Sequence, residues 1–472
     1  MHVCIIGTGA SGWITCTLLR KVDFIKKITI IGCSKIPSIG VGESTTLSFV
    51  SSFLNDVDLK KFVQESDASV KYGVYYKNWS KRDFIHPFKS QNPFLRLGCT
   101  ELTWGESLSN KNTNTHIHDI VANRLWNFIQ KNEVSLDNVE NPHSWHFDAG
   151  KFIQFLKKVN LEDEKVSLIE DKIVDSKFLF KDTIQYIVGQ SNVNYTADYF
   201  VNCCGNNDTN IKVFKEDYTS LSQYLLTNKA LVCPLKYNNI REEIHPYTVA
   251  KTMNTGWRWI TPTQSRIGTG YVFSDNHISV DEATSEFLKD IGDISLNPSL
   301  VDIAPKLNNK PFKSNNCAIG MSSGFLEPLD APGLSLSIHG VELLIQLLEY
   351  KKDSKSLIRY FNFLNTSNDM MKKQHEWWCS FILNQYKTCW RNDTQFWLDH
   401  KSVECDFYNQ IINSLYCVPP GLFERHEYMM FYFTIAAKDI KWKSKITQKP
   451  FPTEELDTKT IHHLDYIKSF YD

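Results

Sequence analysis

The sequence predicts an α/β fold that begins with a doubly wound parallel sheet and ends in a mainly helical lobe. Residues 2–7, HVCIIG, form a β-branched run that stops at glycine, and a segment with helix-spaced apolar residues follows. KKITIIG at 26–32 repeats the strand pattern. A strand, a glycine turn, a helix and a second strand within about thirty residues make a βαβ unit. After Val341 the apolar residues recur at helical spacing instead.

Length and composition indicate a globular protein with more than one module. The chain has 472 residues, of which 42% are hydrophobic and 22% charged. We expect a first module at residues 1–350 and a C-terminal helical lobe at 351–472. The formal net charge of −1 argues against nucleic acid as the main partner and favours a small ligand. The most apolar run, MMFYFTIAA at 429–437, is too short to span a bilayer, so no membrane role is expected.

The cysteine pattern predicts free thiols. Twelve cysteines are scattered along the chain, none of them in a C-x-x-C pair. No secretory segment precedes the first strand. We therefore expect buried thiols in a reducing cytoplasm and no metal site.

Further strands and then helices are expected along the chain. The strand patterns are KIVDSKFLF at 172–180, TIQYIVG at 183–189 and DYFVNCCG at 198–205. Helical spacing begins at residue 342 and continues through a segment rich in aromatic residues, including Trp377, Trp378, Trp390 and Trp397.

Gly7, Gly9 and Gly12 form G-x-G-x-x-G between the first strand and the first helix. The first glycine permits a tight turn, the second lets a pyrophosphate approach the backbone, and the third lets helix and strand pack closely. The context favours a dinucleotide site over a merely structural turn. The second strand ends in Gly32 and Cys33 rather than in an acid, so the ribose contact must be made differently.

A second glycine turn, GVGESTT, follows at 40–46. It could contact a cofactor or cap the following helix, and both can be true. The candidate cofactor contacts in this turn are Gly40, Gly42, Glu43, Ser44 and Thr45.

Lys71 lies in an apolar, aromatic run, ASVKYGVYYKNW at 68–79. The alternation is typical of a strand and would place Lys71 and Tyr75 on the same face. Such a lysine is either an edge-strand surface residue or a buried amine with an altered pKa, and the residues alone favour the surface. FIHPF at 84–88 and GWRWITP at 256–262 hold His86, Phe88, Trp257 and Trp259, for which a turn histidine and core packing are the plain interpretations.

The loop SSGFLEPLDAPG at 322–333 carries two acids, Glu327 and Asp330. Two prolines and two glycines exclude a regular helix or strand over this segment. We expect a rigid, bent loop.

Taken in chain order, these segments resemble the flavin-dependent tryptophan-type halogenases. The signature W-x-W-x-I-P, which separates these halogenases from flavin hydroxylases, reads Trp257-Arg258-Trp259-Ile260-Thr261-Pro262 here, with threonine in the isoleucine position. The matching segments are the glycine turn at 7–12, VGEST at 41–45, ASVK at 68–71 with NW at 78–79, FIHPF, SWHFDA at 144–149, DYFVNCCG, GWRWITP, IGTGYVFS at 267–274 and SSGFLEPLDAPG.

The resemblance implies a glutathione-reductase-like FAD domain and two-component chemistry. A separate flavin reductase delivers FADH2, O2 converts it to the flavin C4a-hydroperoxide, and halide attack gives hypohalous acid. Trp257 and Trp259 would keep flavin and substrate apart. The oxidant would travel to Lys71, which therefore should be buried and would act as a hydrogen-bond donor or as a haloamine.

The other family roles also map onto this chain. Asp330 matches the family glutamate that assists the electrophile or takes up the ring proton, and His86 and Phe88 match the residues beside the aromatic substrate. Glu327 is expected to be structural or near the flavin, at the border of the substrate tunnel. Gly320 and Gly333 are further candidate cofactor contacts.

The loop departs from the family after its acid. The family continues as Ser-Thr-Gly, with the halide near those backbone N–H groups, whereas this chain has Ala331-Pro332-Gly333. Aspartate reaches about 1.5 Å less than glutamate. Pro332 has no N–H, and Ala331 has no hydroxyl. The less polar halide site predicts a preference for bromide or iodide over chloride.

The substrate is expected to be a small arene: a phenol, an indole or tryptophan. RNDTQFW at 391–397 still resembles the family, but YCVPPGLFERHEYMMFYF at 416–433 gives no tyrosine–glutamate–tryptophan set for the head group of free tryptophan. Two alternatives are a flavin monooxygenase or reductase of the same superfold, with a structural Lys71, and a non-catalytic flavin sensor.

Overall fold

The computed structural model describes residues 1–34, 43–46, 49, 52–54, 57–71, 73–80, 83–87, 144–205, 208–245, 247–352 and 357–415. Gly40, Gly42, Phe88 and the segments at 416–433 and 429–437, on which expectations were placed, lie outside these ranges.

A five-stranded parallel sheet forms the first layer, as the βαβ pattern predicts. Its order is β20-β12-β1-β2-β8, and every neighbouring pair is parallel. The strands are β1 (His2–Ile6), β2 (Lys27–Gly32), β8 (Val166–Glu170), β12 (Tyr199–Asn202) and β20 (Asn316–Ala318).

Both faces of this sheet are covered, which explains why its strands read as continuous apolar runs. Val3 and Ile5 pack toward the helices α1 (Ala10–Leu19), α6 (Ala149–Leu161) and α10 (Pro332–Lys352). Cys4 and Ile6 pack toward the opposite layer. That layer contains β9 (Ile173–Phe180), β10 (Thr183–Gly189), β11 (Asn194–Tyr195) and α7 (Asp208–Phe214).

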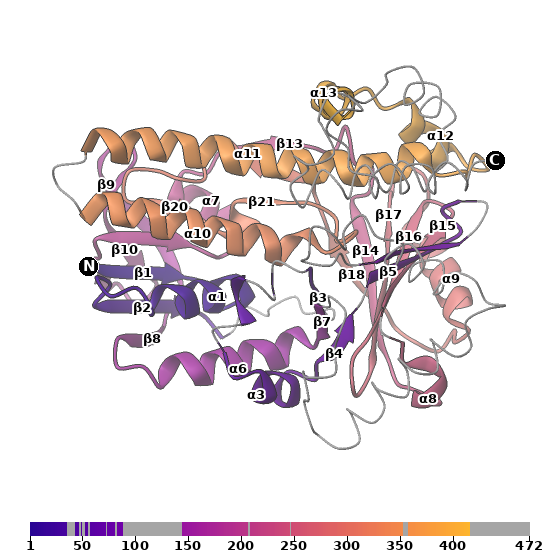
Figure 1. The fold of residues 1–472 in the computed structure, drawn as a ribbon, viewed down its shortest axis with the longest axis horizontal. Helices are drawn as coiled ribbons and strands as arrows, with labels where there is room; N and C mark the ends of the chain where they lie inside the picture. The colour runs from indigo at the N-terminus through magenta and orange to yellow at the C-terminus, as the bar shows by residue number, and fades with distance from the viewer. Residues whose placement is uncertain are drawn as a thin grey trace, which may run out of the picture.

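A second, seven-stranded sheet lies beside the parallel sheet (Figure 1), in the order β18-β14-β17-β16-β15-β5-β6. Helix α9 (Val280–Ile291) covers one face, and the C-terminal helices cover the other. The strands are β5 (Gly73–Lys77), β6 (Phe84–Pro87), β14 (Lys229–Leu235), β15 (Thr248–Met253), β16 (Gly256–Pro262), β17 (Ile267–Phe273) and β18 (Ser299–Asp302), and the C-terminal helices are α11 (Leu357–Thr388), α12 (Gln395–Ser402) and α13 (Asp406–Leu415).

Helix α11 joins the two hydrophobic cores. It has 32 residues and runs along α10 before it reaches the seven-stranded sheet (Figure 1). Tyr360 and Met371 belong to the core of the parallel sheet, whereas Trp378 and Tyr386 belong to the core of the second sheet. In the described chain no helix, α11 included, is both long and apolar enough to cross a membrane.

Two small sheets lie between the larger ones. One contains β3 (Glu43–Ser44), β7 (Ser144–Phe147) and β4 (Ser69–Lys71), and the other contains β13 (Tyr218–Ser220), β19 (Lys306–Asn308) and β21 (Gly324–Phe325). The short helices are α3 (Leu59–Glu65), α8 (Ile240–Glu243) and η3 (Gly320–Ser322).

The run that contains Lys71 is not one strand, and this part of the sequence analysis is wrong. β4 and β5 belong to different sheets, because β4 pairs with β7 whereas β5 pairs with β15 and β6. Lys71 and Tyr75 therefore do not share a strand face. The alternation of residue types continues through the break, but the pairing partners of the two halves are far apart in sequence.

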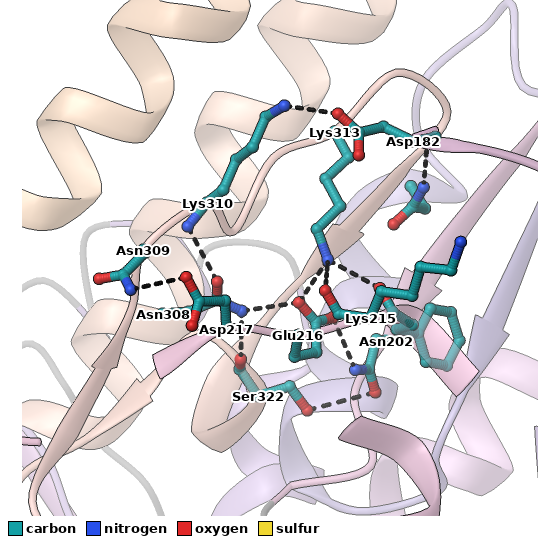
Figure 2. Close-up of polar contacts among 12 residues, drawn as sticks. Asp182, Asn202, Lys215, Glu216, Asp217, Asn308, Asn309, Lys310, Lys313 and Ser322 are labelled. Carbon is teal, nitrogen blue, oxygen red and sulfur yellow. Dashed lines mark hydrogen bonds and ion pairs between the residues drawn. The ribbon is translucent and has the colours of Figure 1, made fainter. Parts of the chain in front are cut away.

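A buried ion pair fixes the start of the loop 322–333 (Figure 2). Lys313 Nζ lies 2.6 Å from Glu216 Oε2, and both side chains are at most 6% exposed. The Glu216 carboxylate also accepts hydrogen bonds from Asn202, at the end of β12, and from Asn308 of β19. Asn308 donates further to the carbonyl oxygen of Ser322 at 3.1 Å. The loop thus begins from a position fixed to the parallel sheet.

The ten cysteines in the described ranges are free thiols, as the sequence predicts for them. Most are buried, and burial raises the pKa of Cys4 and of Cys203 to about 12. These two thiols therefore stay protonated and unreactive near neutral pH.

Candidate functional site

The glycine turn after β1 leaves room for a phosphate group. Gly7 has a φ of 115°, and a Cβ there would lie 2.4 Å from the Cys203 carbonyl oxygen. A Cβ at Gly12 would lie 2.0 Å from the Gly7 oxygen, whereas one at Gly9 would meet nothing within 4 Å. Gly9 is also the N-cap of α1 and forms no side-chain cap. The start of α1 is therefore open to an anion such as the FAD pyrophosphate.

The expectation that 322–333 contains no helix or strand is wrong, because β21 covers Gly324–Phe325 and α10 begins at Pro332, where proline fits the first helical turn. Only residues 326–331 are irregular, and this segment ends beside the glycine turn. Gly320, just before the loop, has a φ of 69°, and a Cβ there would lie 2.2 Å from Ser11 Oγ. Ser11 Oγ is 3.2 Å from Ser337 Oγ of α10. Gly333, the second residue of α10, would carry a Cβ with nothing within 4 Å. Gly320 and the start of α10, which contains Gly333, therefore lie close to the first turn of α1.

Dinucleotide-binding folds usually carry an acid at the end of their second strand, where it binds the ribose hydroxyls. In this structure a carboxylate lies close to that position but belongs to the neighbouring strand. β2 ends at Gly32, and a Cβ there would lie 2.3 Å from the Thr8 side chain. Glu170 ends the neighbouring strand β8, and its Oε1 accepts hydrogen bonds from the Ser34 backbone N–H at 2.6 Å and hydroxyl at 2.8 Å. Sequence reasoning missed this acid because only the pairing of β8 with β2 brings it to this edge.

The small sheet β3-β7-β4 has one polar and one aromatic face. Ser69 pairs with His146, and Lys71 pairs with Ser144, so these four side chains share a face. All four are buried. Val70, Trp145 and Phe147 point to the other side and join the first hydrophobic core. This aromatic face anchors the strand that carries Lys71.

Lys71 is buried, with 1% of its surface exposed, which excludes the surface interpretation. Its Nζ donates a hydrogen bond to the carbonyl oxygen of Thr45 at 2.9 Å. Burial lowers the pKa of Lys71 to about 8, and the nearby charge of Asp330 opposes that shift. Lys71 and Asp330, 259 positions apart in sequence, therefore belong to one site.

The described part of the GVGESTT segment, residues 43–46, makes hydrogen bonds to Lys71 and to its neighbours in the small sheet. Thr45 Oγ1 is 2.5 Å from Ser144 Oγ, and Ser44 Oγ is 2.9 Å from Thr248 Oγ1. Glu43 contributes backbone to β3. The segment therefore contacts Lys71 directly, because the carbonyl oxygen of Thr45 accepts the hydrogen bond from the amine.

Asp330 lies in a tight turn closed by the Ala331 N–H, which donates to the Pro328 carbonyl oxygen at 2.9 Å. Asp330 and Ala331 have φ values of 59° and 61°, in the left-handed region. The Asp330 side chain is buried and accepts a hydrogen bond from the Tyr76 hydroxyl. Burial and the Asp330 charge raise the pKa of Tyr76 well above its usual value, so Tyr76 stays a donor.

Tyr76, rather than Tyr75, is the tyrosine at this site. Tyr75 points to the other side of β5, where its hydroxyl donates to Asp83 at 3.0 Å and its ring lies 5.6 Å from that of Tyr247. The sequence analysis missed Tyr76 because it assumed one continuous strand through Lys71.

Glu327, the other acid of the loop, binds to different elements. It is fully buried and accepts hydrogen bonds from the hydroxyls of Thr227 and of Tyr386 in α11, the latter at 3.0 Å. Burial raises the pKa of Glu327 to about 7, although the two hydroxyls act in the opposite direction. This acid connects the loop to α11.

Trp257 and Trp259 lie next to each other on β16, with ring centroids 6.2 Å apart. Both are buried in the hydrophobic core that also contains Tyr76 and Leu329. Gly270 of β17 makes room for them, since a Cβ there would lie 2.1 Å from the Trp259 ring. The backbone of His86 belongs to β6 and pairs with Val74.

His146 is a further buried polar residue that sequence reasoning did not select. Its Nε2 is 2.8 Å from Thr248 Oγ1. Burial, followed by the charge of Lys71, lowers the pKa of His146 well below its usual value, so the ring is neutral. The alternation in S-W-H-F, with polar residues at 144 and 146, was the available signal.

Comparisons with known proteins identify the family. The family model for tryptophan halogenases matches residues 2–427. Tryptophan 6-halogenase ThaL of Streptomyces albogriseolus is 26% identical over 431 residues, which are 85% of this chain and 79% of that protein. Tryptophan 7-halogenase RebH of Lentzea aerocolonigenes is 24% identical over 426 residues, 85% of this chain and 79% of that protein.

Solved structures share the fold. A tryptophan halogenase from Shewanella frigidimarina aligns with a TM-score of 0.79 and 21% identity over 99% of this chain and 93% of that one. A flavin-dependent halogenase from Xanthomonas campestris aligns with a TM-score of 0.74 and 20% identity over 99% and 94% of the two chains. Because the family model spans most of the sequence, this chain belongs to the tryptophan halogenase family and is a flavin-dependent halogenase.

Proposed function

We propose that this enzyme halogenates a small, electron-rich arene at Lys71 and Asp330, using FADH2, O2 and a halide ion. The observation that carries the proposal is the buried Lys71 ammonium, which donates to the Thr45 carbonyl oxygen and lies in the field of Asp330. When bound, reduced FAD supplies with O2 the oxidant that converts halide to hypohalous acid.

The cofactor would bind at the glycine turn. Gly7, Gly9 and Gly12 would accommodate the pyrophosphate, and we propose that Glu170 takes the place of the missing ribose acid at the end of β2. The Ser44 segment and Gly320 would lie along the flavin. A separate flavin reductase would supply FADH2, and the free thiols in the described ranges favour a reducing compartment such as the cytoplasm.

Lys71 would hold hypohalous acid and make its halogen more electrophilic. With a pKa of about 8 the amine is mainly protonated at pH 7, which favours the hydrogen-bonding role over the haloamine. Asp330 would accept the proton that the ring loses when the carbon–halogen bond forms. Trp257 and Trp259 would separate the flavin from the arene, and His86 and Phe88 would lie beside the substrate ring.

The start of α10 supports a preference for bromide or iodide over chloride. Pro332 is the first residue of this helix and has no N–H, so Gly333 provides the first backbone donor. Chloride holds its hydration water more strongly than bromide or iodide and needs better donors to replace it. The site of Ala331, Pro332 and Gly333 offers fewer of these donors than a serine–threonine–glycine sequence.

An arene panel tests the proposal. The enzyme is incubated with a flavin reductase, FAD, NADH, O2 and halide, together with phenols, indoles and tryptophan, and the products are identified by mass. Halide-dependent addition of halogen is the expected result. Hydroxylated products would instead indicate a monooxygenase, and hydrogen peroxide with no arene product would indicate a flavin sensor.

A further inference from the structure

We propose that Tyr76 is a positioning residue that compensates for the short Asp330 side chain. This inference rests on the proposed halogenation. The Tyr76 hydroxyl donates to Asp330 Oδ2, and both side chains are buried. No other part of the proposed mechanism uses Tyr76.

The backbone at Asp330 needs an external restraint. Asp330 and Ala331 both adopt left-handed φ values, a conformation that is strained for alanine and better tolerated by aspartate. They persist only where the surroundings determine them. The Ala331–Pro328 hydrogen bond closes the turn, and the Tyr76 hydrogen bond restrains the carboxylate itself.

Tyr76 is well suited to provide that restraint. β5 lies between β15 and β6, and Tyr76 pairs with Ala250 on one side and with Phe84 on the other. Its ring packs edge-on against Trp79, with the centroids 5.7 Å apart. A phenol on an interior strand is a rigid donor, whereas Asp330 lies in residues 326–331, which are neither helix nor strand.

The charges around the pair favour a fixed donor over a proton carrier. Asp330 lies near enough to Lys71 for its charge to oppose the lowering of the Lys71 pKa by burial. Burial, followed by the charges of Asp330 and Glu327 and by the Tyr386 phenol, raises the pKa of Tyr76. Tyr76 therefore keeps its proton. A hydroxyl that donates to a carboxylate forms a charge-assisted bond, about twice as strong as a neutral one. Tyr76 would thus hold Asp330 oriented toward Lys71 and the ring proton without taking part in proton transfer.

Tyr76→Phe tests this role, because it removes only the hydroxyl. We expect kcat for arene halogenation to fall about ten- to a hundredfold, the loss expected for one charge-assisted hydrogen bond. KM for the arene should stay within about twofold, and the release of hypohalous acid to a dissolved trap should be unchanged. Tyr75→Phe is the matched control, since it removes a hydroxyl from the opposite face of β5 and should leave kcat unchanged.

The second arm replaces Asp330 with the longer acid. In an Asp330→Glu background, Tyr76→Phe should cost less than about threefold in kcat, because the longer side chain no longer depends on the phenol. An equal penalty in both backgrounds, or no penalty in the native one, would overturn the inference. Circular dichroism melting curves confirm that each variant is folded. If the native enzyme makes no halogenated product at all, the proposed function fails and not this inference alone.

Discussion

The ammonium of Lys71 and the carbonyl oxygen of Thr45 are joined by a 2.9 Å hydrogen bond in the interior of the molecule. This contact fixes the amine to the segment that follows the second glycine turn. The hydrogen-bond acceptor of the amine is therefore an uncharged backbone oxygen. The nearby negative charge that favours the protonated amine belongs to Asp330, in the segment before α10.

Replacing Lys71 with alanine should abolish halogenation and spare flavin oxidation. We expect arene product to fall by at least about a hundredfold, because both proposed roles of the lysine need its nitrogen. Hydrogen peroxide formation should continue at the native rate. Product analysis and a peroxide assay on the same samples measure both quantities. Lys77→Ala, an exposed lysine on β5, serves as control, and a Lys71→Ala enzyme that still halogenates would remove the lysine from the mechanism.

The stability of the native enzyme should rise between about pH 8 and pH 10.5 through Lys71. The pKa of Lys71 is about 8 in the folded protein, below its ordinary value of 10.5, so in this range the unfolded chain binds more protons. The shift corresponds to an increase of about 3 kcal/mol in the free energy of unfolding. This increase is absent below pH 8 and is complete near pH 10.5. Urea unfolding of native and Lys71→Met enzymes at pH 7 and pH 10 measures it.

In Lys71→Met this rise should be missing, and the variant should be at least as stable as the native enzyme at pH 7, although inactive. The same rise in both proteins would show that another group causes it.

Glu327 should give the opposite dependence on pH. Its folded pKa of about 7 is above the ordinary value of 4.5, so its stabilising contribution is complete below pH 4.5 and is lost as the pH rises through 7. The loss should reach about 3 kcal/mol. Glu327→Gln removes the titration, and the stability difference between the two proteins should therefore change between pH 5 and pH 8. A constant difference over this range would contradict the raised pKa.

Equal concentrations of chloride, bromide and iodide should give mainly brominated or iodinated product. Ala331→Ser combined with Pro332→Thr restores a hydroxyl and a backbone N–H, and should shift the product ratio toward chloride by roughly tenfold, the effect of one hydrogen bond. Mass spectrometry of a single competition reaction measures the ratio. Dominant chlorinated product from the native enzyme would exclude the preference.

The start of the fold could be predicted because its information is local. A strand buried on both faces reads as a continuous apolar run, and Gly12 is required by contact with the backbone of Gly7, in the same turn. The burial of Lys71 and its proximity to Asp330 followed from family resemblance, since no local pattern links residues so far apart.

The errors and omissions arose where pairing is long-range. The break between β4 and β5 cannot be seen in the alternation around Lys71, because it depends on β7 and β15. Tyr76 was therefore missed in favour of Tyr75. Glu170 was missed because it belongs to β8, which is far from β2 in sequence. Only the pairing of the two strands places Glu170 beside Gly32, at the end of β2.

The length of α11 bears on how the molecule loses its structure. A helix of 32 residues is about 48 Å long, and it contributes side chains to both hydrophobic cores. Opening either core would strip one half of this helix of its packing, so the two sheets should unfold as one cooperative unit. Amide protons in the middle of α11 should then exchange with solvent only through global unfolding. Slow bending between the sheets is accordingly disfavoured, so Lys71 and Asp330 should keep their relative positions during the proposed reaction.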